Sequence, residues 1–501
     1  MGILKNIFVL TLMYSVLFPQ SFNTYLMGYM QGNYQYPPNA PNYVGDEFGK
    51  RLAAGDINGD GYDDLAVFSF YTSTGLLSGE VDVFFGSSPF DTIPDITLKG
   101  EYDLQLFGSG IFMNGDYNSD GVNDLVIGVV GQNDDRGLVK IFFGGSPFDT
   151  TADLIFQENG NINAYFGSDL ASVDFNSDGY DDLLVGAPND RDVFLYFGGA
   201  DMDTVADGVF HRLFWSLNTA GDFNNDGYED FITSGNNWSH LYYGGDTVNT
   251  DVDLIFHASG DIEANDYNGD SFVDLYFSLT GIFLGGEIPD TTLDITAPVE
   301  FRGNPAAGKY NMDGFSDLIL GQSGNGCGVV YLHLGNNPMN NIPDGYFYDT
   351  GCGKLGYRTA AGDFNGDGAD DMAFSERWYQ NYFEFWPDYK IGRVYVFSGD
   401  TTSLSVSEDV PILSQDFRLF DPYPNPFNAV VTIPFELDNN SYVIARLFDI
   451  KGRLVDVFIN EEKTAGFYEF TYQANTIPTG VYFIRFTTNT GSDVKKIILL
   501  K

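Results

Sequence analysis

The sequence predicts an all-β chain: a seven-bladed β-propeller followed by a small immunoglobulin-like β-sandwich. Three observations lead to this fold class. A nine-residue acidic motif occurs seven times between residues 56 and 371. Each copy leads into a short apolar run rich in strand-forming residues, which is typical of buried β-strands. After residue 416 the motif is absent, and 85 residues of alternating polar and apolar character favour six or seven strands of a sandwich.

The acidic motif sets the repeat. Its copies are DINGDGYDD (56–64), DYNSDGVND (116–124), DFNSDGYDD (174–182), DFNNDGYED (222–230), DYNGDSFVD (266–274), KYNMDGFSD (309–317) and DFNGDGADD (363–371). Successive copies begin 43 to 60 residues apart. Periods of about 40 to 60 residues with several short strands per period are typical of propeller blades. Seven copies therefore predict seven blades.

Within one unit the elements follow in a fixed order. Small residues such as Ala53-Ala54-Gly55 precede the acidic loop and suit an innermost strand, where converging blades leave little room. A second strand follows the loop, a third ends in an aromatic-glycine pair, and a fourth often follows. The seventh unit has little sequence left for an outer strand, so Thr24–Met30 (TYLMGYM) is expected to close the ring.

The motif has the spacing of a calcium loop. Oxygen-bearing side chains at positions 1, 3, 5 and 9, with a main-chain carbonyl at position 7, suit a hard cation that takes six to eight oxygens, and glycine at position 6 permits the sharp turn. An EF-hand is disfavoured because position 12 of the first copy is Val67, inside a predicted strand. The expected ligands are Asp56, Asn58, Asp60, Tyr62 and Asp64; Asp116, Asn118, Asp120, Val122 and Asp124; Asp174, Asn176, Asp178, Tyr180 and Asp182; Asp222, Asn224, Asp226, Tyr228 and Asp230; Asp266, Asn268, Asp270, Phe272 and Asp274; and Asp363, Asn365, Asp367, Ala369 and Asp371.

Two loops depart from the pattern. Lys309 replaces the first acid of the sixth loop, and because its ammonium could itself occupy the cation position, no calcium is expected there, which leaves about six calcium sites. Ser271 replaces the position-6 glycine of the fifth loop and is expected to weaken that site without abolishing it. The alternative is that hydrogen-bonded Asx turns satisfy all these loops without metal.

Charge and the N-terminus limit the functional classes. The net charge is −46, and residues 417–501 carry nine acidic and nine basic residues, so the excess lies before them. Such a chain would repel phosphates, which argues against nucleic acid. The apolar run from Ile7 to Phe18 follows Lys5 and is too short to span a bilayer, so residues 1–22 are predicted to be a signal peptide. No other segment is long and apolar enough to be transmembrane in the mature chain.

The two cysteines are expected to pair. If 328–335 pairs antiparallel with 344–351 through a turn centred near residue 339, Cys327 lies opposite Cys352. A cross-strand disulfide then fits an oxidising compartment, and two buried thiols are the alternative.

One connection is rich in aromatic residues. Connections between second and third strands lie on the face opposite the acidic loops, and most are short, such as APNDR or TSGNNWS. The connection at 375–392 is long, and its aromatic side chains form a candidate contact surface for a glycan or a protein. The alternative is that this loop packs on itself or caps the channel. The candidate contacts are Trp378, Tyr379, Tyr382, Phe385, Trp386 and Tyr389.

The repeats resemble a known family. The Phe-Gly pairs at 48–49, 107–108 and 166–167, the acidic loops and Gly186-Ala187-Pro188 are similar to the FG-GAP repeats of integrin alpha-subunit propellers and their bacterial relatives, over about residues 44 to 400. This resemblance implies the propeller fold and leaves function open, because adhesion receptors and secreted enzymes share it. A literal Gly-Ala-Pro occurs only in the third copy.

The tail resembles the C-terminal sorting domain of the type IX (Por) secretion system of Bacteroidetes-like bacteria. The similar segments are YPNPFN (423–428), DIKGR (449–453), PTGVY (478–482) and Lys495-Lys496. The resemblance implies export through that machinery to the outer cell surface or medium of a Gram-negative bacterium. The expected organisation is a signal peptide (1–22), a propeller (23–400), a linker (401–416) and a sorting domain (417–501).

No catalytic motif stands out, and the four histidines, at 211, 240, 257 and 333, are not spaced as ligand pairs and are expected to be structural. The leading interpretation is an exported, calcium-stabilised propeller that binds an extracellular glycan or protein without chemistry. Two alternatives are a polysaccharide-active enzyme and a structural surface-layer component. Basic and carboxylate residues converging at the channel mouth opposite the calcium loops would favour the enzyme.

Overall fold

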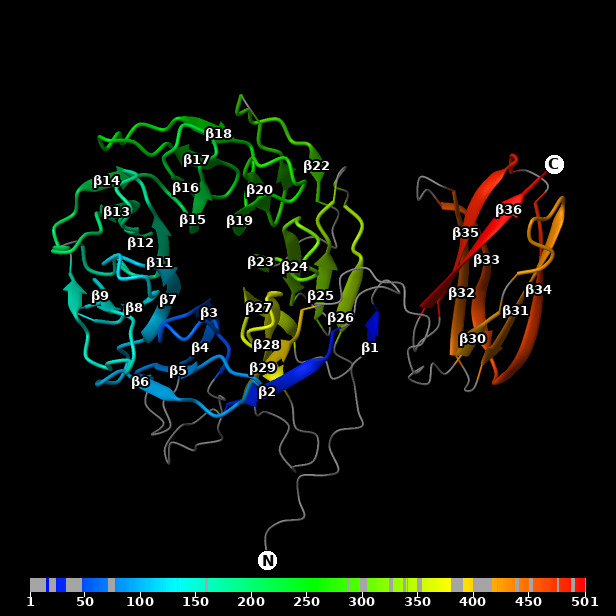
Figure 1. The fold of residues 1–501 in the computed structure, drawn as a ribbon, viewed down its shortest axis with the longest axis horizontal. Helices are drawn as coiled ribbons and strands as arrows, with labels where there is room; N and C mark the ends of the chain where they lie inside the picture. The colour runs from blue at the N-terminus through cyan, green and yellow to red at the C-terminus, as the bar shows by residue number, and fades with distance from the viewer. Residues whose placement is uncertain are drawn as a thin grey trace, which may run out of the picture. The chain divides into compact units, whose positions relative to one another are not determined.

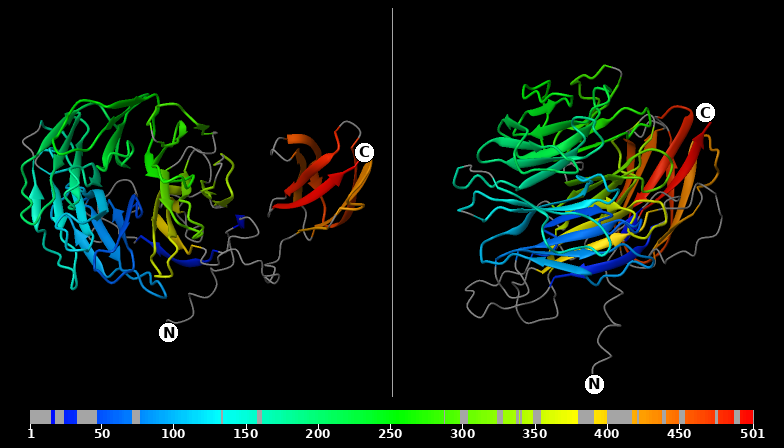
Figure 2. Two further views of the ribbon diagram at one scale, coloured as in Figure 1. Left: turned by 45° about the horizontal axis from the view of Figure 1, so that its top comes forward. Right: turned by 60° about the vertical axis from the view of Figure 1, so that its left-hand side comes forward.

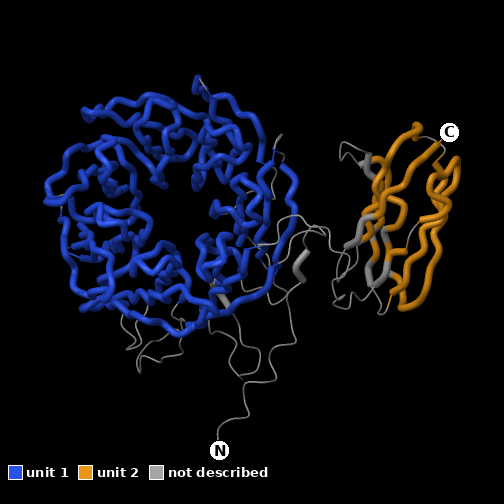
Figure 3. The backbone as a smooth tube through the Cα atoms, in the orientation of Figure 1, with its two compact units in different colours: residues 1–404 blue, residues 405–501 orange. Residues whose placement is uncertain are grey.

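The fold is known from a computed structural model of the chain. It describes residues 15–17, 24–32, 47–70, 77–132, 134–157, 161–286, 288–297, 304–323, 328–336, 339, 341–348, 354–379, 391–399, 417–420, 422–437, 441–449, 454–474, 477–487 and 492–500. These residues fall into two compact units, residues 1–404 and residues 405–501 (Figure 3).

The first unit is a seven-bladed propeller, as the repeat count predicts (Figure 1). Each blade is an antiparallel sheet, and the strands that a repeat contributes lie in sequence order from the innermost outward. The first four blades are β3 (Arg51–Gly55) to β6 (Ile96–Lys99), with β4 (Asp64–Ser69) and β5 (Glu80–Phe84); β7 (Phe107–Gly115), β8 (Asp124–Val129), β9 (Val139–Phe142) and β10 (Leu154–Phe156); β11 (Asp169–Val173), β12 (Asp182–Ala187), β13 (Asp192–Tyr196) and β14 (Gly208–His211); and β15 (Ser216–Gly221), β16 (Asp230–Ser234), β17 (Ser239–Tyr242) and β18 (Leu254–Phe256).

The last three blades repeat this order. They are β19 (Ile262–Asn265), β20 (Asp274–Phe277), β21 (Gly281–Phe283) and β22 (Ile295–Thr296); β23 (Asn304–Gly308), β24 (Asp317–Gln322), β25 (Val329–His333) and β26 (Gly345–Tyr348); and β27 (Leu355–Gly362), β28 (Asp371–Tyr379) and β29 (Ile391–Phe397). A short strand, β1 (Ser15–Leu17), lies inside the predicted signal peptide and pairs with β26 at the edge of the sixth blade.

The N-terminal segment closes the ring. Strand β2 (Leu26–Gln31) pairs antiparallel with β29 and becomes the outer strand of the seventh blade, which confirms the expectation for Thr24–Met30. The Thr24 hydroxyl donates to the Ser398 carbonyl at 2.5 Å, 374 residues away in sequence. The innermost strand β27 also contacts β3, so the two ends of the repeat array meet on the inner wall as well.

The Phe-Gly pairs pack each blade against the preceding one. Phe107 is buried, and Gly108 has a positive φ of 96°. A Cβ on Gly108 would come within 2.6 Å of the Phe68 ring in the preceding blade. Glycine is therefore required there both by conformation and by the close approach of two blades. Figure 2 shows the blades obliquely, and Figure 1 labels their innermost strands around the common axis.

The second unit is a two-sheet sandwich, as the tail predicts. One sheet orders β30 (Phe417–Leu419), β31 (Val430–Leu437) and β34 (Gly466–Gln473), and the other orders β33 (Leu454–Lys463), β32 (Ser441–Asp449), β35 (Gly480–Thr487) and β36 (Ser492–Leu499). Apolar side chains of both sheets form its core, among them Ile433, Leu447 and Ile484. Asn425 ties the entry segment to the last strand, donating to the Lys496 carbonyl at 2.8 Å.

The described register of the sixth blade bears on the cysteine argument without testing it. Strands β25 and β26 pair antiparallel as expected, with Val329 opposite Tyr348 and Leu332 opposite Gly345. The residue numbers of these opposed pairs sum to two less than those of Cys327 and Cys352 do. Both cysteines lie outside the described residues, so their pairing stays a prediction. Among the residues that are described, no helix is long and apolar enough to cross a membrane.

Candidate functional site

All seven acidic loops connect the first and second strands of their blades and share one backbone trace. The residue before each loop pairs with the acid at position 9, as Gly55 pairs with Asp64 and Gly362 with Asp371. Positions 4 and 6 both have positive φ in every loop; in the first they are Gly59 at 72° and Gly61 at 89°. The sequence pattern predicted the special conformation at position 6 only. Position 4 escapes notice because Ser119, Ser177, Asn225 and Met312 adopt it in other copies.

Carboxylates at positions 1 and 5 accept main-chain hydrogen bonds within their own loop. In the third loop Asp174 accepts the N–H groups of Asp178 at 3.0 Å and Gly179 at 3.1 Å, and Asp178 accepts that of Tyr180 at 3.0 Å. The position-3 amide joins this network, since Asn176 Nδ2 donates to Asp178 at 3.0 Å. Three polar side chains therefore crowd the inside of one tight turn.

The acid at position 9 anchors the loop to the blade. Asp182 is fully buried, and its two oxygens accept the N–H groups of Gly198 at 2.8 Å and Phe175 at 3.0 Å. Gly198 belongs to the aromatic-glycine pair that ends the third strand. The same bond to the third-strand glycine recurs in every loop, from Gly86 to Asp64 at 2.8 Å through Gly399 to Asp371 at 2.9 Å. Position 9 thus explains why the loop motif and the distant aromatic-glycine pair repeat together.

Burial raises the pKa of these anchoring carboxyls. For Asp182 the pKa rises to about 8, mainly by burial and further by the negative charges of Asp178 and Asp174, while the two N–H bonds act in the opposite direction. The pKa of Asp230 rises to about 7 for the same reasons. A cation between positions 1, 5 and 9 would relieve this repulsion.

The loop residues fit a calcium ion in type and number. Each carboxylate has about four acceptor positions, so the loop N–H bonds leave lone pairs for a metal. Among the described residues, however, no three carboxylate, imidazole or thiol side chains already converge as a ligand cluster. The carboxylates face the loop N–H groups instead, and a bound cation would draw them inward.

The sixth loop corrects one expectation. Lys309 is exposed and forms no ion pair with the described acids, so its ammonium does not occupy the cation position. The loop nevertheless keeps its trace: Asn311 and Asp313 make the usual turn bonds, at 3.1 Å and 3.0 Å. The turn is therefore formed by positions 3 to 6 and does not require the acid at position 1.

The fifth loop keeps its geometry despite its serine. Ser271 adopts a φ of 72°, and its N–H donates to Asp266 at 2.8 Å as the glycine does elsewhere. The left-handed conformation costs a residue with a Cβ about 1 kcal/mol. The substitution therefore stores strain in this loop without changing its shape.

Position 8 links neighbouring blades, a role that the sequence did not reveal. The Asp63 carboxylate accepts the N–H of Asp363 at 2.8 Å, across the closure between the first and seventh blades. Equivalent bonds join Asp181 to Asp116 at 2.8 Å, Glu229 to Asp174 at 3.2 Å and Asp370 to Lys309 at 2.6 Å. The acidic loops therefore form a chain of contacts around one face of the ring.

Charged side chains converge at the opposite mouth of the channel, where the innermost strands begin. The Arg51 guanidinium interacts favourably with the carboxylates of Asp169 and Asp261. The positive charge of Arg358 lies near enough to repel that of Arg51. Burial raises the pKa of Asp169 to about 6, and the Arg51 charge partly offsets that rise. This is the arrangement that would favour an enzyme.

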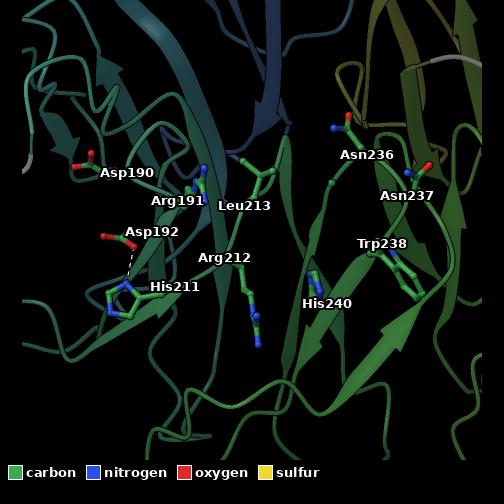
Figure 4. Close-up of a pocket in the computed structure, with 11 residues that line it drawn as sticks. Asp190, Arg191, Asp192, His211, Arg212, Leu213, Asn236, Asn237, Trp238 and His240 are labelled. Carbon is green, nitrogen blue, oxygen red and sulfur yellow. Dashed lines mark hydrogen bonds and ion pairs between the residues drawn. The ribbon is translucent and has the colours of Figure 1, made fainter.

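A pocket of about 600 Å³ opens on the same face, between the third and fourth blades (Figure 4). It is lined by the two short connections that looked unremarkable in sequence, APNDR and TSGNNWS, and by the end of β14. His211 and His240 both line it, together with Arg191, Arg212 and Trp238. Sequence spacing missed this group because its members come from two blades.

The aromatic connection is described only at its ends. Strand β28 extends to Tyr379, which pairs with Ile391, so the hairpin continues further than expected. The side chains of Trp378 and Tyr379, and all of Tyr382, Phe385, Trp386 and Tyr389, lie outside the described residues.

Comparisons with known proteins agree with both units. The chain matches the FG-GAP repeat model at residues 48–77 and 166–200, and the secretion system C-terminal sorting domain model at residues 422–500. The chain carries FG-GAP repeats and a sorting domain. Neither family model covers half of the chain, so each match describes only the segment that it covers.

Curated relatives are integrin alpha subunits. Integrin alpha-5 of Xenopus laevis is 32% identical over 174 residues, 31% of this chain and 16% of the relative. Integrin alpha-PS5 of Drosophila melanogaster is 32% identical, over 30% of this chain and 16% of the relative. The chain thus spans about a sixth of these relatives. A crystal structure of BBS1N in complex with ARL6DN is 8% identical, covers 72% of this chain and 95% of that chain, and has a TM-score of 0.44.

Proposed function

We propose that this protein is an exported, calcium-stabilised propeller that acts as a non-catalytic binding module on the bacterial surface or in the medium. The sorting domain supports export through the type IX machinery. The observation that most supports calcium binding is that six loops each place acids at positions 1, 5 and 9 around one turn. In each of these loops the acid at position 9 is buried. Calcium would neutralise these acids and tighten the loops, each of which touches the neighbouring blade.

Thermal unfolding with and without chelator tests the proposal. Calcium binds the native state and not the unfolded chain, so saturating calcium should raise Tm by several degrees, and a chelator should reverse the rise. Magnesium at equal concentration is the control, because it demands tighter octahedral geometry and should stabilise less. An unchanged Tm in chelator would refute the calcium part.

The pH dependence provides a second readout. Without metal, the buried acids have folded pKa values of about 7 to 8, for example Asp124 and Asp182, above their unfolded values. Their stabilising contribution is present at low pH and is lost as pH rises through the folded pKa. The chelated protein should therefore lose stability from pH 6 to pH 8.5. With calcium this loss should shrink or reverse, because the metal favours the ionised carboxylates.

A second candidate function rests on the channel mouth. Asp169, with its pKa of about 6, could donate a proton, and Asp261 lies within electrostatic reach of the same arginine. Paired carboxylates are the machinery of glycoside hydrolysis. Release of reducing ends from a polysaccharide by the intact protein, abolished in Asp169→Asn, would favour this function over simple binding.

A further inference from the structure

We propose that the pocket between the third and fourth blades binds an acidic sugar, a saccharide unit bearing a carboxylate or a sulfate. This inference rests on the proposed function, in which the face opposite the acidic loops carries the binding activity. The pocket lies on that face because the second-to-third-strand connections and the end of the outer strand β14 all lie there. Its volume of about 600 Å³ suits one sugar unit and part of a neighbour.

The pocket concentrates the cationic groups of a strongly acidic protein. Before residue 417 the chain has 15 Lys and Arg against 61 Asp and Glu, after the nine of each in the tail are subtracted from 24 and 70. Two of these arginines, Arg191 and Arg212, line the pocket with two of the four histidines. A third histidine, His257, packs against the pocket residue Trp238.

The carboxylates of the pocket are already engaged. Asp192 accepts from His211 Nδ1 at 2.6 Å, and Asp190 accepts two bonds from Asn161, at 3.0 Å and 2.9 Å. Within the described part of the chain, by contrast, the Arg191 guanidinium has no hydrogen-bonded or ion-paired partner. The acceptors are thus taken while a strong donor remains available, which favours an anionic ligand. Guanidinium groups match carboxylate and sulfate oxygens especially well.

The centre of the pocket adds neutral polar groups. Figure 4 shows Arg212 between His211 and His240, with the Asn236 and Asn237 amides above Trp238. Burial and the Arg212 charge lower the pKa of His240, which favours its neutral ring. His240 Nδ1 is buried and unpartnered in the described structure. A neutral imidazole and two amides suit ligand hydroxyl groups, which both donate and accept.

Trp238 gives the pocket a platform for a sugar ring. Its side chain is 45% exposed although its neighbour His240 is mostly covered. The His257 ring lies 3.7 Å away, centroid to centroid, and holds the indole in place. An exposed, pre-positioned indole offers a large apolar face at little cost in side-chain entropy. A flat apolar face beside anion and hydroxyl donors is the combination that a charged sugar needs, and a simple inorganic anion would leave the indole unused.

Calorimetric titration of the full chain in calcium and about 0.15 M salt tests the inference, since this salt shortens the range of the overall repulsion. The probes are a galacturonate tetrasaccharide, a sulfated galactose tetrasaccharide without carboxylates and a neutral galactose tetrasaccharide. At least one acidic probe should bind about tenfold more tightly than the neutral one, and the two acidic arms separate carboxylate from sulfate recognition.

Variants locate the binding. Arg191→Gln should weaken acidic-probe binding about tenfold and leave the neutral probe nearly unchanged, whereas Trp238→Ala should weaken both. Arg136→Gln makes the same charge change in the corresponding connection of the second blade and should have little effect. Equal effects of Arg191→Gln and Arg136→Gln, or equal binding of acidic and neutral probes, would overturn the inference. Acidic binding unaffected by Arg191→Gln and Trp238→Ala would also overturn it, while leaving a binding module intact. The calcium-dependent Tm is unaffected by any of these results.

Discussion

The two faces of the propeller differ in how they use the repeat. On the loop face, every blade places an acid at position 9 on the third-strand glycine, and four blades send an acid at position 8 to a neighbour. On the opposite face the connections differ in length and composition, and two of them form the pocket beside β14. Regular chemistry repeated around a ring indicates a structural role, and local irregularity indicates a binding role.

The position-9 acid should show the largest effect on the loop face. Asp182→Ala removes the acceptor of two buried N–H groups, Gly198 and Phe175, and should lower the free energy of unfolding by about 2 to 5 kcal/mol. Asp178→Ala, at the exposed position 5, is the matched control. In chelator the loss from Asp182→Ala should persist and exceed that of Asp178→Ala. Equal losses would mean that position 9 acts only through the metal.

The link at position 8 should have an intermediate effect. Asp63→Ala removes the bond to Asp363 across the ring closure and should cost about 1 to 2 kcal/mol in denaturant unfolding. Asn123 occupies the same position in the second blade, and its side chain makes no equivalent bond to Asp56 in the described structure. Asn123→Ala should therefore change stability by less than about 0.5 kcal/mol. Similar values for both variants would show that the carboxylate link adds nothing to the main-chain contact.

The strained serine should have the smallest effect. Ser271→Gly relieves a left-handed conformation but gives the unfolded chain more freedom, so the net gain should be about 0.5 kcal/mol. Gly227→Ser in the fourth loop is the reciprocal change. No atom lies within 4 Å of a Cβ built there, so its cost should be conformational only. Thermal unfolding of both should give shifts of opposite sign, and shifts of one sign would contradict this explanation.

Local sequence patterns predicted the fold because each blade is encoded within one repeat. Small residues before the loop, glycine at position 6 and the aromatic-glycine pair fix the blade, and Thr24–Met30 followed from the missing outer strand. Contacts between blades were harder to foresee. Asp63 and Asp363 are 300 residues apart, and no sequence feature near Asp63 predicts that its carboxylate contacts Asp363.

The pocket was missed for the same reason. His211 and His240 lie in different blades, and each alone suggests a structural histidine; only the ring brings them to one cavity. In the cysteine argument, a difference of one residue in the centre of the turn changes the sum of every opposed pair by two, so the sequence alone did not fix the register. The placement of the Lys309 ammonium at the cation position was wrong, because a long exposed side chain is not held in place by its backbone position alone.

Calcium stoichiometry tests whether the acidic loops are metal sites. Each loop with an acid at position 1 should hold one ion, so the protein should bind about six calcium ions per chain by equilibrium dialysis and elemental analysis. Because the sixth loop keeps the same trace without that acid, Lys309→Asp should raise the number to about seven and increase Tm in calcium. No bound calcium, or no additional ion in Lys309→Asp, would contradict the account.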